Sequence, residues 1–502
     1  MIQSCADALE PKGTLSGLSP VCDHSEPMAG DRSTQSGVNA IGFFRAEFGH
    51  GEAARRILTG IDRAGIPHAT ITVKTPHHRE KHPFTARGDR PTYPTNVVCL
   101  NPEHMLEFAH LGGAELFLDR YTIGVWCWEA SRFPDAFRPA FDLVDEIWVA
   151  SDYVAEIIAE ATDKPVQVFP MPVEVKPAPA LGRSDVGLPG DRFVFLFAFD
   201  FFSTVERKNP YGLIDAFARA FAPGEGPLLV IKTINGQRQA GELKRLVQAA
   251  SVHPDIRVVD EYVSGEQMRG LVANCDSFVS LHRSEGFGFS MAEAMVYEKP
   301  VIATGYSGNL TFMNDENSYL VGFGLTPVPP GSANYPAGAL WADPDLDDAA
   351  AAMRRVVENP DDVRERGRRG HETIARQHTL QRTSEFIATR LAEIERLPRK
   401  ERREEAALDR AARFLSAGPS LSWTAPSGRF GAIGVLARRT LVRLLRPYLV
   451  RQREWESLVV EQLRENQRLL REQAERISQL EAELRDDDLQ PLHTREIDRP
   501  LS

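Results

Sequence analysis

The sequence predicts an α/β protein that contains two successive doubly wound parallel sheets. Three observations predict this fold class: short apolar runs recur along the chain, helical patterns separate most of them, and a segment rich in proline and glycine divides the runs into two sets. Alternation of strands and helices is typical of parallel sheets that are covered on both faces. The length of 502 residues is sufficient for two or three domains.

Composition narrows the class of protein. Apolar residues make up 42% of the chain and charged residues 26%, which is normal for a soluble globular protein. The net charge of −11 argues against a nucleic-acid partner. The five cysteines are scattered and form no CxxC pair, so we expect a reducing cytoplasm and neither a disulfide framework nor a structural zinc. We expect no membrane-spanning helix, because no apolar run of about 18 residues is present. We expect no signal peptide, because the N-terminus has no basic region followed by an apolar core.

The first set of runs predicts a domain over residues 37–175. Residues 1–36 are rich in Ser, Gly, Pro and Asp and predict a disordered lead-in. A buried strand at 38–44 is followed by a glycine-containing turn and a helix that closes near Ala64. Further strands are predicted at 68–73, 96–101, 121–129, 146–151 and 166–173.

The second set predicts a domain over residues 191–375. The segment rich in proline and glycine before it, at 174–191, marks the boundary, with 176–190 as the linker. Strands are predicted at 192–201, 227–234, 256–263, 277–282 and 300–305, and a further helix at 376–397. Ligands of such sheets bind at the carboxyl ends of the strands, so we expect the site in a cleft between the two domains.

The C-terminal part of the sequence differs in character. After a linker at 398–428, seven arginines and no acidic residue occupy 429–453, within a predicted basic amphipathic helix at 429–455. Such a helix either binds an anionic membrane surface or packs on the rest of the chain or in an oligomer. Heptad positions in 456–486 predict a short coiled coil and a homodimer. Residues 487–502 predict a disordered tail.

The most informative motif is "SEGFGFSMAEAM", where a predicted strand passes into a helix. Gly286 and Gly288 allow a close backbone approach, and the helix start offers unpaired N–H groups that suit a diphosphate. Glu285 and Glu293 flank the loop, and carboxylates accept hydrogen bonds from sugar and ribose hydroxyls. The alternative is structural, because Ser290 and Glu293 also fit a capping box.

This motif, with the following "KPVIATGYSGN", resembles the signature of the retaining glycosyltransferases of family 4, of the bacterial surface-glycan type. The pattern is Glu-x7-Glu, and the resemblance covers residues 38–395. It implies the GT-B fold, in which two Rossmann-like domains face a cleft, the first binding the acceptor and the second the nucleotide-sugar donor. It also implies a nucleoside-diphosphate sugar as co-substrate, with no other cofactor and no metal.

The resemblance assigns roles to residues of the second domain. Glu285 would hydrogen-bond the donor sugar, and Glu293 the ribose. The phosphates would lie on the loop and helix start, which comprise Gly286, Phe287, Gly288, Phe289 and Ser290. The loop after the next strand, with Gly308 and Asn309, would complete the donor pocket.

A second motif, "FDFFSTVERKNP", follows the first strand of the second domain. The family places basic residues here, and Arg207 and Lys208 match. Fixed cations at this place stabilise the charge that develops on the leaving nucleoside diphosphate. The common family form has a further arginine where this chain has Phe202. The alternative is that both cations are ordinary surface charges before a helix that starts at a proline.

Two motifs of the first domain would face the donor. The resemblance places Gly49, His50 and Gly51 opposite the phosphates, although His50 could also be a solvated loop residue. Glu129 could position the acceptor hydroxyl or act as a base. The tryptophans beside it, Trp126 and Trp128, either stack on a sugar or pack in the core.

The expected function is therefore that of a metal-independent, retaining hexosyltransferase. It would transfer a sugar from a nucleoside-diphosphate donor to a glycan or lipid-linked acceptor in surface polysaccharide biosynthesis. We expect a peripheral location at the inner face of the plasma membrane. Two alternatives remain open: a non-catalytic scaffold of the same fold that binds nucleotide sugars, and a sugar-nucleotide epimerase.

Overall fold

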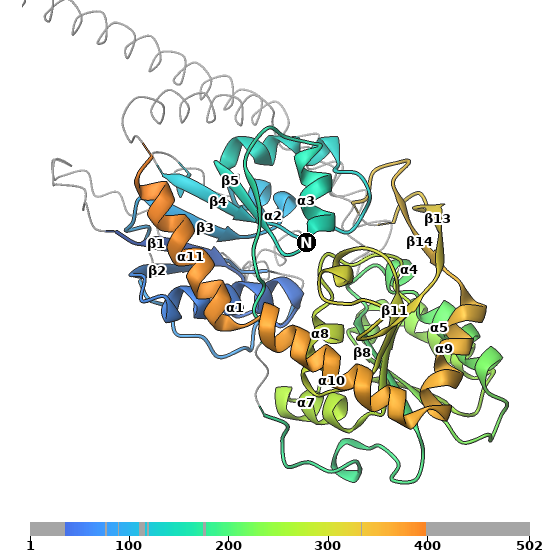
Figure 1. Ribbon diagram of the computed structural model, residues 1–502. Helices are drawn as coiled ribbons and strands as arrows, with labels where there is room; N and C mark the ends of the chain where they lie inside the picture. The colour runs from blue at the N-terminus through green and yellow to red at the C-terminus, as the bar shows by residue number, and fades with distance from the viewer. Residues whose placement is uncertain are drawn as a thin grey trace, which may run out of the picture. The chain divides into compact units, whose positions relative to one another are not determined.

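The computed structural model describes residues 36–397, apart from 76–77, 89, 110–115, 118–119, 174–176 and 333. These residues contain two six-stranded parallel sheets and one two-stranded antiparallel sheet (Figure 1). The two parallel sheets confirm the predicted fold class. The predictions for the lead-in, for the linker at 398–428, the basic helix, the coiled coil and the tail lie outside the described residues, except at Ser36.

The first sheet lies in residues 36–173, which we call the N-terminal half. Its strand order is β2-β1-β3-β4-β5-β6. The interior strand β1 is buried at every position, as expected for a parallel strand that is covered on both faces. The strands are β1 Val38–Gly42, β2 His68–Thr72, β3 Thr95–Cys99, β4 Tyr121–Val125, β5 Glu146–Val149 and β6 Val166–Val168. The helices are α1 Gly49–Arg63, α2 Pro102–Phe108, η3 Asp135–Leu143 and α3 Asp152–Ala159.

The second sheet lies in residues 177–377, which we call the C-terminal half. Its strand order is β12-β11-β10-β7-β8-β9. The strands are β7 Val194–Asp200, β8 Leu228–Ile234, β9 Ile256–Asp260, β10 Ser277–Ser280, β11 Val301–Thr304 and β12 Tyr319–Val321. The helices are η4 Ser184–Val186, α4 Val205–Lys208, α5 Pro210–Ala220, η5 Gly236–Gln239, α6 Ala240–Ala250, α7 Gly265–Asn274, α8 Phe289–Val296, η6 Gly308–Thr311, α9 Leu346–Glu358 and α10 Pro360–Gln377.

Each predicted strand overlaps an observed strand, but β3 begins one residue before its predicted run, at Thr95, and several observed strands end earlier than predicted. The run predicted at 121–129 leaves the sheet after Val125, and the run predicted at 166–173 leaves it after Val168. Both continuations are apolar and contain buried residues such as Trp126 and Phe169, so hydrophobicity alone could not locate the strand ends.

A hairpin that the sequence did not predict projects from the C-terminal half. It comprises β13 Phe323–Pro327 and β14 Leu340–Pro344, paired antiparallel and separate from both parallel sheets. We call residues 323–344 the hairpin arm. Its residues Val328, Ala339 and Trp341 are buried in the same apolar cluster as Trp126 of the N-terminal half.

The last helix, α11 Leu380–Glu395, returns to the N-terminal half. Figure 1 shows α10 along the C-terminal half and α11 beside α1. A β-carbon at Gly60 of α1 would lie 3.1 Å from Thr383 and Ile387 of α11, so the glycine permits this close packing. The Arg390 guanidinium binds Glu146 of β5, with Nη2 2.7 Å from Oε2.

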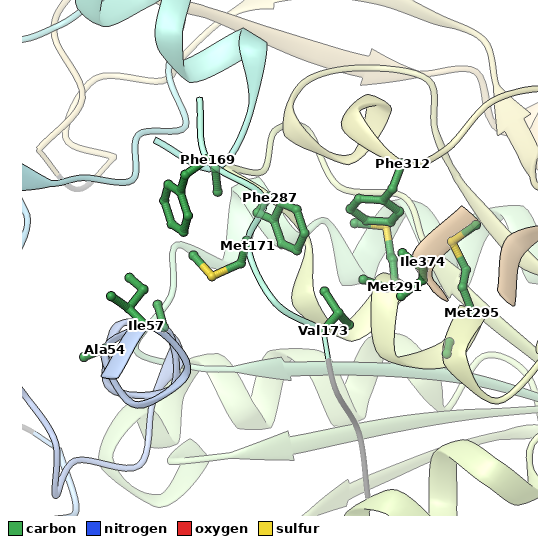
Figure 2. Close-up of a cluster of buried hydrophobic side chains, with 14 of the residues drawn as sticks. Ala54, Ile57, Phe169, Met171, Val173, Phe287, Met291, Met295, Phe312 and Ile374 are labelled. Atoms are coloured by element: carbon green, nitrogen blue, oxygen red, sulfur yellow. The ribbon is translucent and has the colours of Figure 1, made fainter. Parts of the chain in front are cut away.

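An apolar cluster joins the two halves. Ala54 and Ile57 of α1 lie on one side of it, and Met291 of α8 on the other, with Met171 of the crossing chain beside them (Figure 2). The chain passes from one half to the other twice, once after Val173 and once at His378, between α10 and α11. These two crossings are hydrogen-bonded to each other, because Val173 N donates to His378 O over 2.8 Å.

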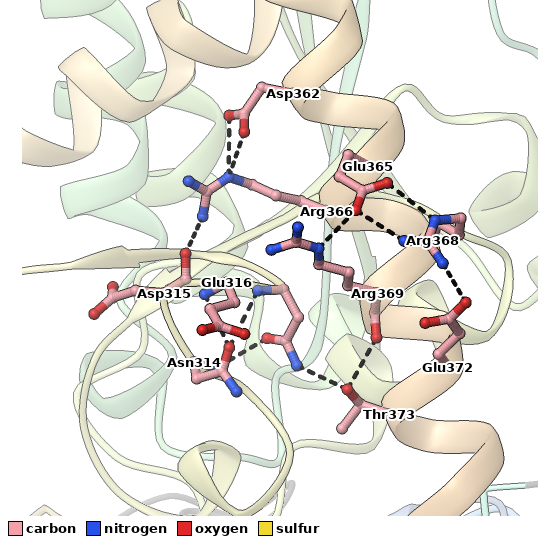
Figure 3. A network of polar contacts seen from close by, with 11 residues as sticks. Asn314, Asp315, Glu316, Asp362, Glu365, Arg366, Arg368, Arg369, Glu372 and Thr373 are labelled. Atoms are coloured by element: carbon pink, nitrogen blue, oxygen red, sulfur yellow. Dashed lines mark hydrogen bonds and ion pairs between the residues drawn. The ribbon is translucent and has the colours of Figure 1, made fainter.

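The exposed face of α10 carries charged residues that tie it to a neighbouring loop. The Arg366 guanidinium binds Asp362 one turn earlier and also donates to the carbonyl oxygen of Asp315 (Figure 3). It donates to Ser318 O over 2.7 Å as well, and Asn317 Nδ2 donates to Thr373 Oγ1 over 3.2 Å. These contacts fix the helix that leads the chain back to the N-terminal half. None of the helices within the described residues is long and apolar enough to cross a membrane.

Candidate active site

A cleft of about 950 Å³ opens between the two sheets. Its N-terminal wall comes from the start of α1 and from the loops after β3 and β4. Its C-terminal wall comes from the ends of β7 and β8, the loop after β10, the start of α8 and the hairpin arm. The cleft therefore lies at the carboxyl ends of the strands, as predicted.

Glu285 lies in this cleft between two cations. Lys208 Nζ and Arg207 Nη1 both approach Oε1 of Glu285, the latter at 3.2 Å, and the glutamate side chain is only 12% exposed. Burial works to raise the pKa of Glu285, but the attraction of Lys208 and Arg207 outweighs it and lowers the pKa to about 2. Glu285 is therefore an anion at neutral pH, and the three charged groups form one unit.

The local sequence explains how the two cations are placed. Asn209 takes a left-handed conformation with φ of 54°, which ends α4 directly after Lys208, and its side chain accepts from Gly212 N to start α5. Arg207 is buried and donates to Ser284 O over 2.8 Å, so it is not the ordinary surface charge of the alternative interpretation. Strands β7 and β10 are paired neighbours, which brings the loops that follow them together.

We call residues 286–288 the glycine loop. This loop leads into α8, and no capping box begins the helix. Gly288, at φ of 99°, is the N-cap, and no side chain caps the helix, so Ser290 lies inside the first turn. The capping-box interpretation is therefore wrong, because the chain turns at Gly288 and not at Ser290. The loop is fixed to the N-terminal half by Ser151 Oγ, which donates to Gly286 O over 2.7 Å.

Gly308 and Asn309 support the glycine loop and do not line the cleft. Gly308 N donates to Glu285 O over 2.9 Å, and a β-carbon at Gly308 would lie 2.2 Å from Gly286 O. Asn309 Oδ1 lies 3.1 Å from Nε2 of His282, which is fully buried at the end of β10, as expected for a packed residue. Gly308 thus positions Glu285 from behind, and Asn309 holds His282 of the same segment.

Glu293 is bound by a cation from the other half. Arg56 Nη2 of α1 lies 2.5 Å from Glu293 Oε1, and the guanidinium also binds Glu52 at 2.8 Å and lies 4.6 Å from the Phe289 ring centroid. The sequence reasoning missed Arg56. Its only signal was the four-residue spacing from Glu52, which places both on one face of α1.

His50 faces the cleft at the start of α1, beside Gly49 and Gly51. A β-carbon at Gly51 would lie 2.4 Å from Ala46 O, so this turn requires glycine. Burial, followed by the charges of His104, His78 and Arg207, lowers the pKa of His50 to about 3. Its Nδ1 is buried without a hydrogen-bond partner. His50 is therefore a neutral cleft residue, and the interpretation as a solvated loop histidine is wrong.

Glu129 lines the cleft opposite the cations, as part of the loop after β4. Of the two tryptophans before it, Trp126 is 1% and Trp128 3% exposed. Both belong to the apolar cluster of the N-terminal half that also contains Trp341 of the hairpin arm, which supports core packing. The residue that sequence reasoning missed here is Tyr335 of the hairpin arm, whose Oη lies 3.3 Å from Glu129 Oε2. No motif marked it.

Phe202, which stands where the resembling family has an arginine, also lines the cleft. The guanidinium of Arg238 lies 5.8 Å from its ring centroid. Among the residues that the structure describes, no group of three or more His, Cys, Asp or Glu is arranged to hold a metal ion.

Comparison with known proteins gives the fold a name. Residues 183–373 match the family model for glycosyl transferases group 1. Sucrose-phosphate synthase from Thermosynechococcus elongatus is 14% identical, with a TM-score of 0.54 over 72% of this chain and 99% of that chain. HepE from Anabaena, solved with UDP and glucose, is 13% identical, with a TM-score of 0.51 over 72% of this chain and 100% of that chain. The fold is GT-B.

A third GT-B structure, a glycosyltransferase from Rickettsia africae ESF-5, is 12% identical, with a TM-score of 0.50 over 73% of this chain and 100% of that chain. No curated protein matches the sequence. The part of the chain that matches the group 1 model lies in the C-terminal half, and that half contributes the glycine loop, Glu285, Arg207 and Lys208 to the GT-B cleft.

Proposed function

We propose that the protein is a retaining glycosyltransferase that transfers a hexosyl group from a nucleoside-diphosphate sugar to a hydroxyl of a glycan or lipid-linked acceptor. The observation that carries this proposal is the unit of Glu285, Arg207 and Lys208, buried in a GT-B cleft beside the N-terminus of α8. The group 1 match supports the reaction class, and the resemblance to family 4 supports retention.

In the proposed reaction, the bond between the anomeric carbon and the diphosphate oxygen breaks. The acceptor oxygen bonds to the same face of that carbon, and its proton passes to an oxygen of the leaving diphosphate. Arg207 and Lys208 stabilise the charge that develops on this leaving group, as does the N-terminus of α8. Glu285 accepts from the sugar hydroxyls, and Glu129 orients the acceptor hydroxyl from the opposite wall.

The first donor to test is a UDP-hexose, because HepE was solved in complex with UDP-glucose. The test mixes the purified protein with a panel of nucleotide sugars and follows thermal shift, and then follows transfer to glycan acceptors. We expect one donor to stabilise the fold and NMR to show the donor's anomeric configuration in the product. An inverted product contradicts retention, whereas tight binding without transfer or hydrolysis supports the scaffold alternative. Conversion of the donor alone into an epimeric nucleotide sugar supports the epimerase.

We also propose that residues 429–453 bind anionic membrane, that residues 456–486 form a homodimer, and that the acceptor belongs to surface polysaccharide biosynthesis. The arginine-rich amphipathic pattern supports membrane binding, and the heptads support the homodimer. The resemblance to family 4 of the surface-glycan type supports the class of acceptor. A variant without 429–453 should lose binding to anionic vesicles, and one without 456–486 should become monomeric in light scattering. Unchanged vesicle binding or an unchanged mass contradicts the respective proposal.

A further inference from the structure

The hairpin arm belongs to the C-terminal half by sequence but packs on the N-terminal half. Leu340 N donates to Ser131 Oγ over 2.7 Å, and Ser131 N donates to Leu340 O over 3.3 Å. Val328 and Trp341 contribute to the apolar cluster of the N-terminal half. The arm therefore connects the two walls of the cleft through contacts that lie outside both parallel sheets.

The root of the arm is attached to the segment that carries Glu285. Ala342 N donates to Arg283 O over 2.8 Å, and Arg283 Nη1 lies 2.6 Å from Asp343 Oδ1. Arg283 precedes Glu285 by two residues, and its own N donates to Arg207 O over 2.7 Å. The position of the arm is thus fixed relative to the three charged residues.

The tip of the arm places Tyr335 against the loop after β4. The Tyr335 ring meets the Trp128 ring at 5.6 Å between centroids and 75° between planes, and Trp341 supports it at 6.1 Å. Its Oη lies 3.3 Å from Glu129 Oε2. Burial and the nearby Glu129 raise the pKa of Tyr335, so the phenol keeps its proton and donates to the carboxylate.

We propose that Tyr335 is a positioning residue, which orients the carboxylate of Glu129 toward the acceptor hydroxyl and makes the arm an acceptor-specifying element. This inference rests on the proposed function. A carboxylate held beside the partly exposed Tyr335 ring suits a pyranose acceptor, because the carboxylate accepts from ring hydroxyls while the Tyr335 ring contacts apolar C–H groups. The Tyr335 hydroxyl contacts Glu129, which we propose orients the acceptor, so we expect its effect on the acceptor rather than on the donor.

The test is Tyr335→Phe, which keeps the ring and removes the hydroxyl. Loss of one hydrogen bond to a charged group should lower kcat/KM for the acceptor about tenfold. The affinity for the nucleotide sugar should stay within about twofold. Tyr211→Phe is the matched control, because Tyr211 lies on α5 outside the cleft, and it should behave as the parent protein does. An unchanged acceptor kcat/KM, or an equal loss of donor affinity, overturns the inference.

A double mutant tests whether Tyr335 acts through Glu129. In a Glu129→Gln background, Tyr335→Phe should cost less than about twofold further activity, because the carboxylate it orients is gone. Full additivity of the two losses overturns the inference.

A crystal structure of Tyr335→Phe provides a readout that does not depend on turnover. We expect the Glu129 side chain to leave the position it has beside residue 335, and an unmoved carboxylate overturns the inference. If the parent protein transfers no sugar from any donor, the proposed function fails, while this structural comparison still decides whether Tyr335 positions Glu129.

Discussion

Arg56 and Glu293 form an ion pair that joins the first helix of the N-terminal half to the helix behind the glycine loop, with Nη2 2.5 Å from Oε1. The guanidinium is held from three further sides, by Glu52, by Pro172 O at 3.2 Å and by the Phe289 ring. The resemblance to family 4 gives Glu293 the ribose of the donor. Arg56 therefore fixes the orientation of a carboxylate that the proposed function requires.

Removing this orientation should weaken donor binding. We expect Arg56→Ala to raise the donor KM about tenfold or more, with a smaller effect on kcat, because a charge-assisted contact to the binding carboxylate is lost. Steady-state kinetics with varied donor measure this. Arg63→Ala is the control, since Arg63 lies on the same helix and binds Gln381. A donor KM equal to that of the control contradicts the prediction.

The charged unit at the centre of the cleft should behave non-additively. Glu285→Gln and Lys208→Ala should each reduce kcat about 100-fold or more, as for loss of one preorganised electrostatic group. Because the two side chains are in direct contact, the double variant should lose much less than the product of both effects. Transfer assays on the two single variants and the double variant form the cycle. Near-normal turnover in both single variants would refute the assignment.

His50 should make the fold sensitive to mild acid. An unfolded histidine has a pKa of about 6.5, whereas the pKa of His50 is about 3 in the folded protein, so between these pH values the unfolded chain binds the extra proton. Stability is therefore lost as the pH falls through this window, by about 2 kcal/mol at pH 5 relative to pH 8. Urea unfolding of His50→Asn at both pH values should show a correspondingly smaller loss. His371→Asn, on α10 outside the cleft, is the control, and equal losses in both variants would count against the prediction.

The ion pair between Glu146 and Arg390 should stabilise the return of the chain to the N-terminal half. Glu146 is fully buried, with further hydrogen bonds from Trp148 Nε1 at 2.7 Å and Tyr121 Oη at 2.9 Å. Arg390→Ala leaves this carboxylate without its cation and should cost about 3 kcal/mol in the free energy of unfolding, measured in urea. Glu393→Ala removes the half-exposed second partner of Arg390 and should cost about 0.5 kcal/mol or less. Similar costs for both would be inconsistent with a buried charge.

The sequence allowed the two sheets to be predicted because their strands are short apolar runs with helical patterns between them. It also placed Glu285, Arg207 and Lys208 in loops at the carboxyl ends of strands, where ligands of such sheets bind, but it did not pair them with one another. The family resemblance supplied the roles of these residues, while the geometry of the loops supplied their contacts.

Other features depend on information that no local pattern carries. The hairpin arm has the composition of a loop, with proline and glycine throughout "TPVPPGSANYPAG", so neither its strands nor Tyr335 were predicted. The pair of Arg56 and Glu293 depends on how the two halves pack. The capping-box interpretation was wrong because Gly288, with its positive φ, is the N-cap of α8 two residues before Ser290.

The first and one of the last described residues meet on the same half of the molecule: Ser36, two residues before β1, donates a hydrogen bond to Glu395 of α11. The segments that flank the described fold on both sides are therefore anchored to the half that we propose binds the acceptor. The half with the glycine loop is connected covalently only through the two crossings near Val173 and His378. Attachment of either flanking segment to a surface or a partner would therefore hold the acceptor side of the cleft at that surface or partner.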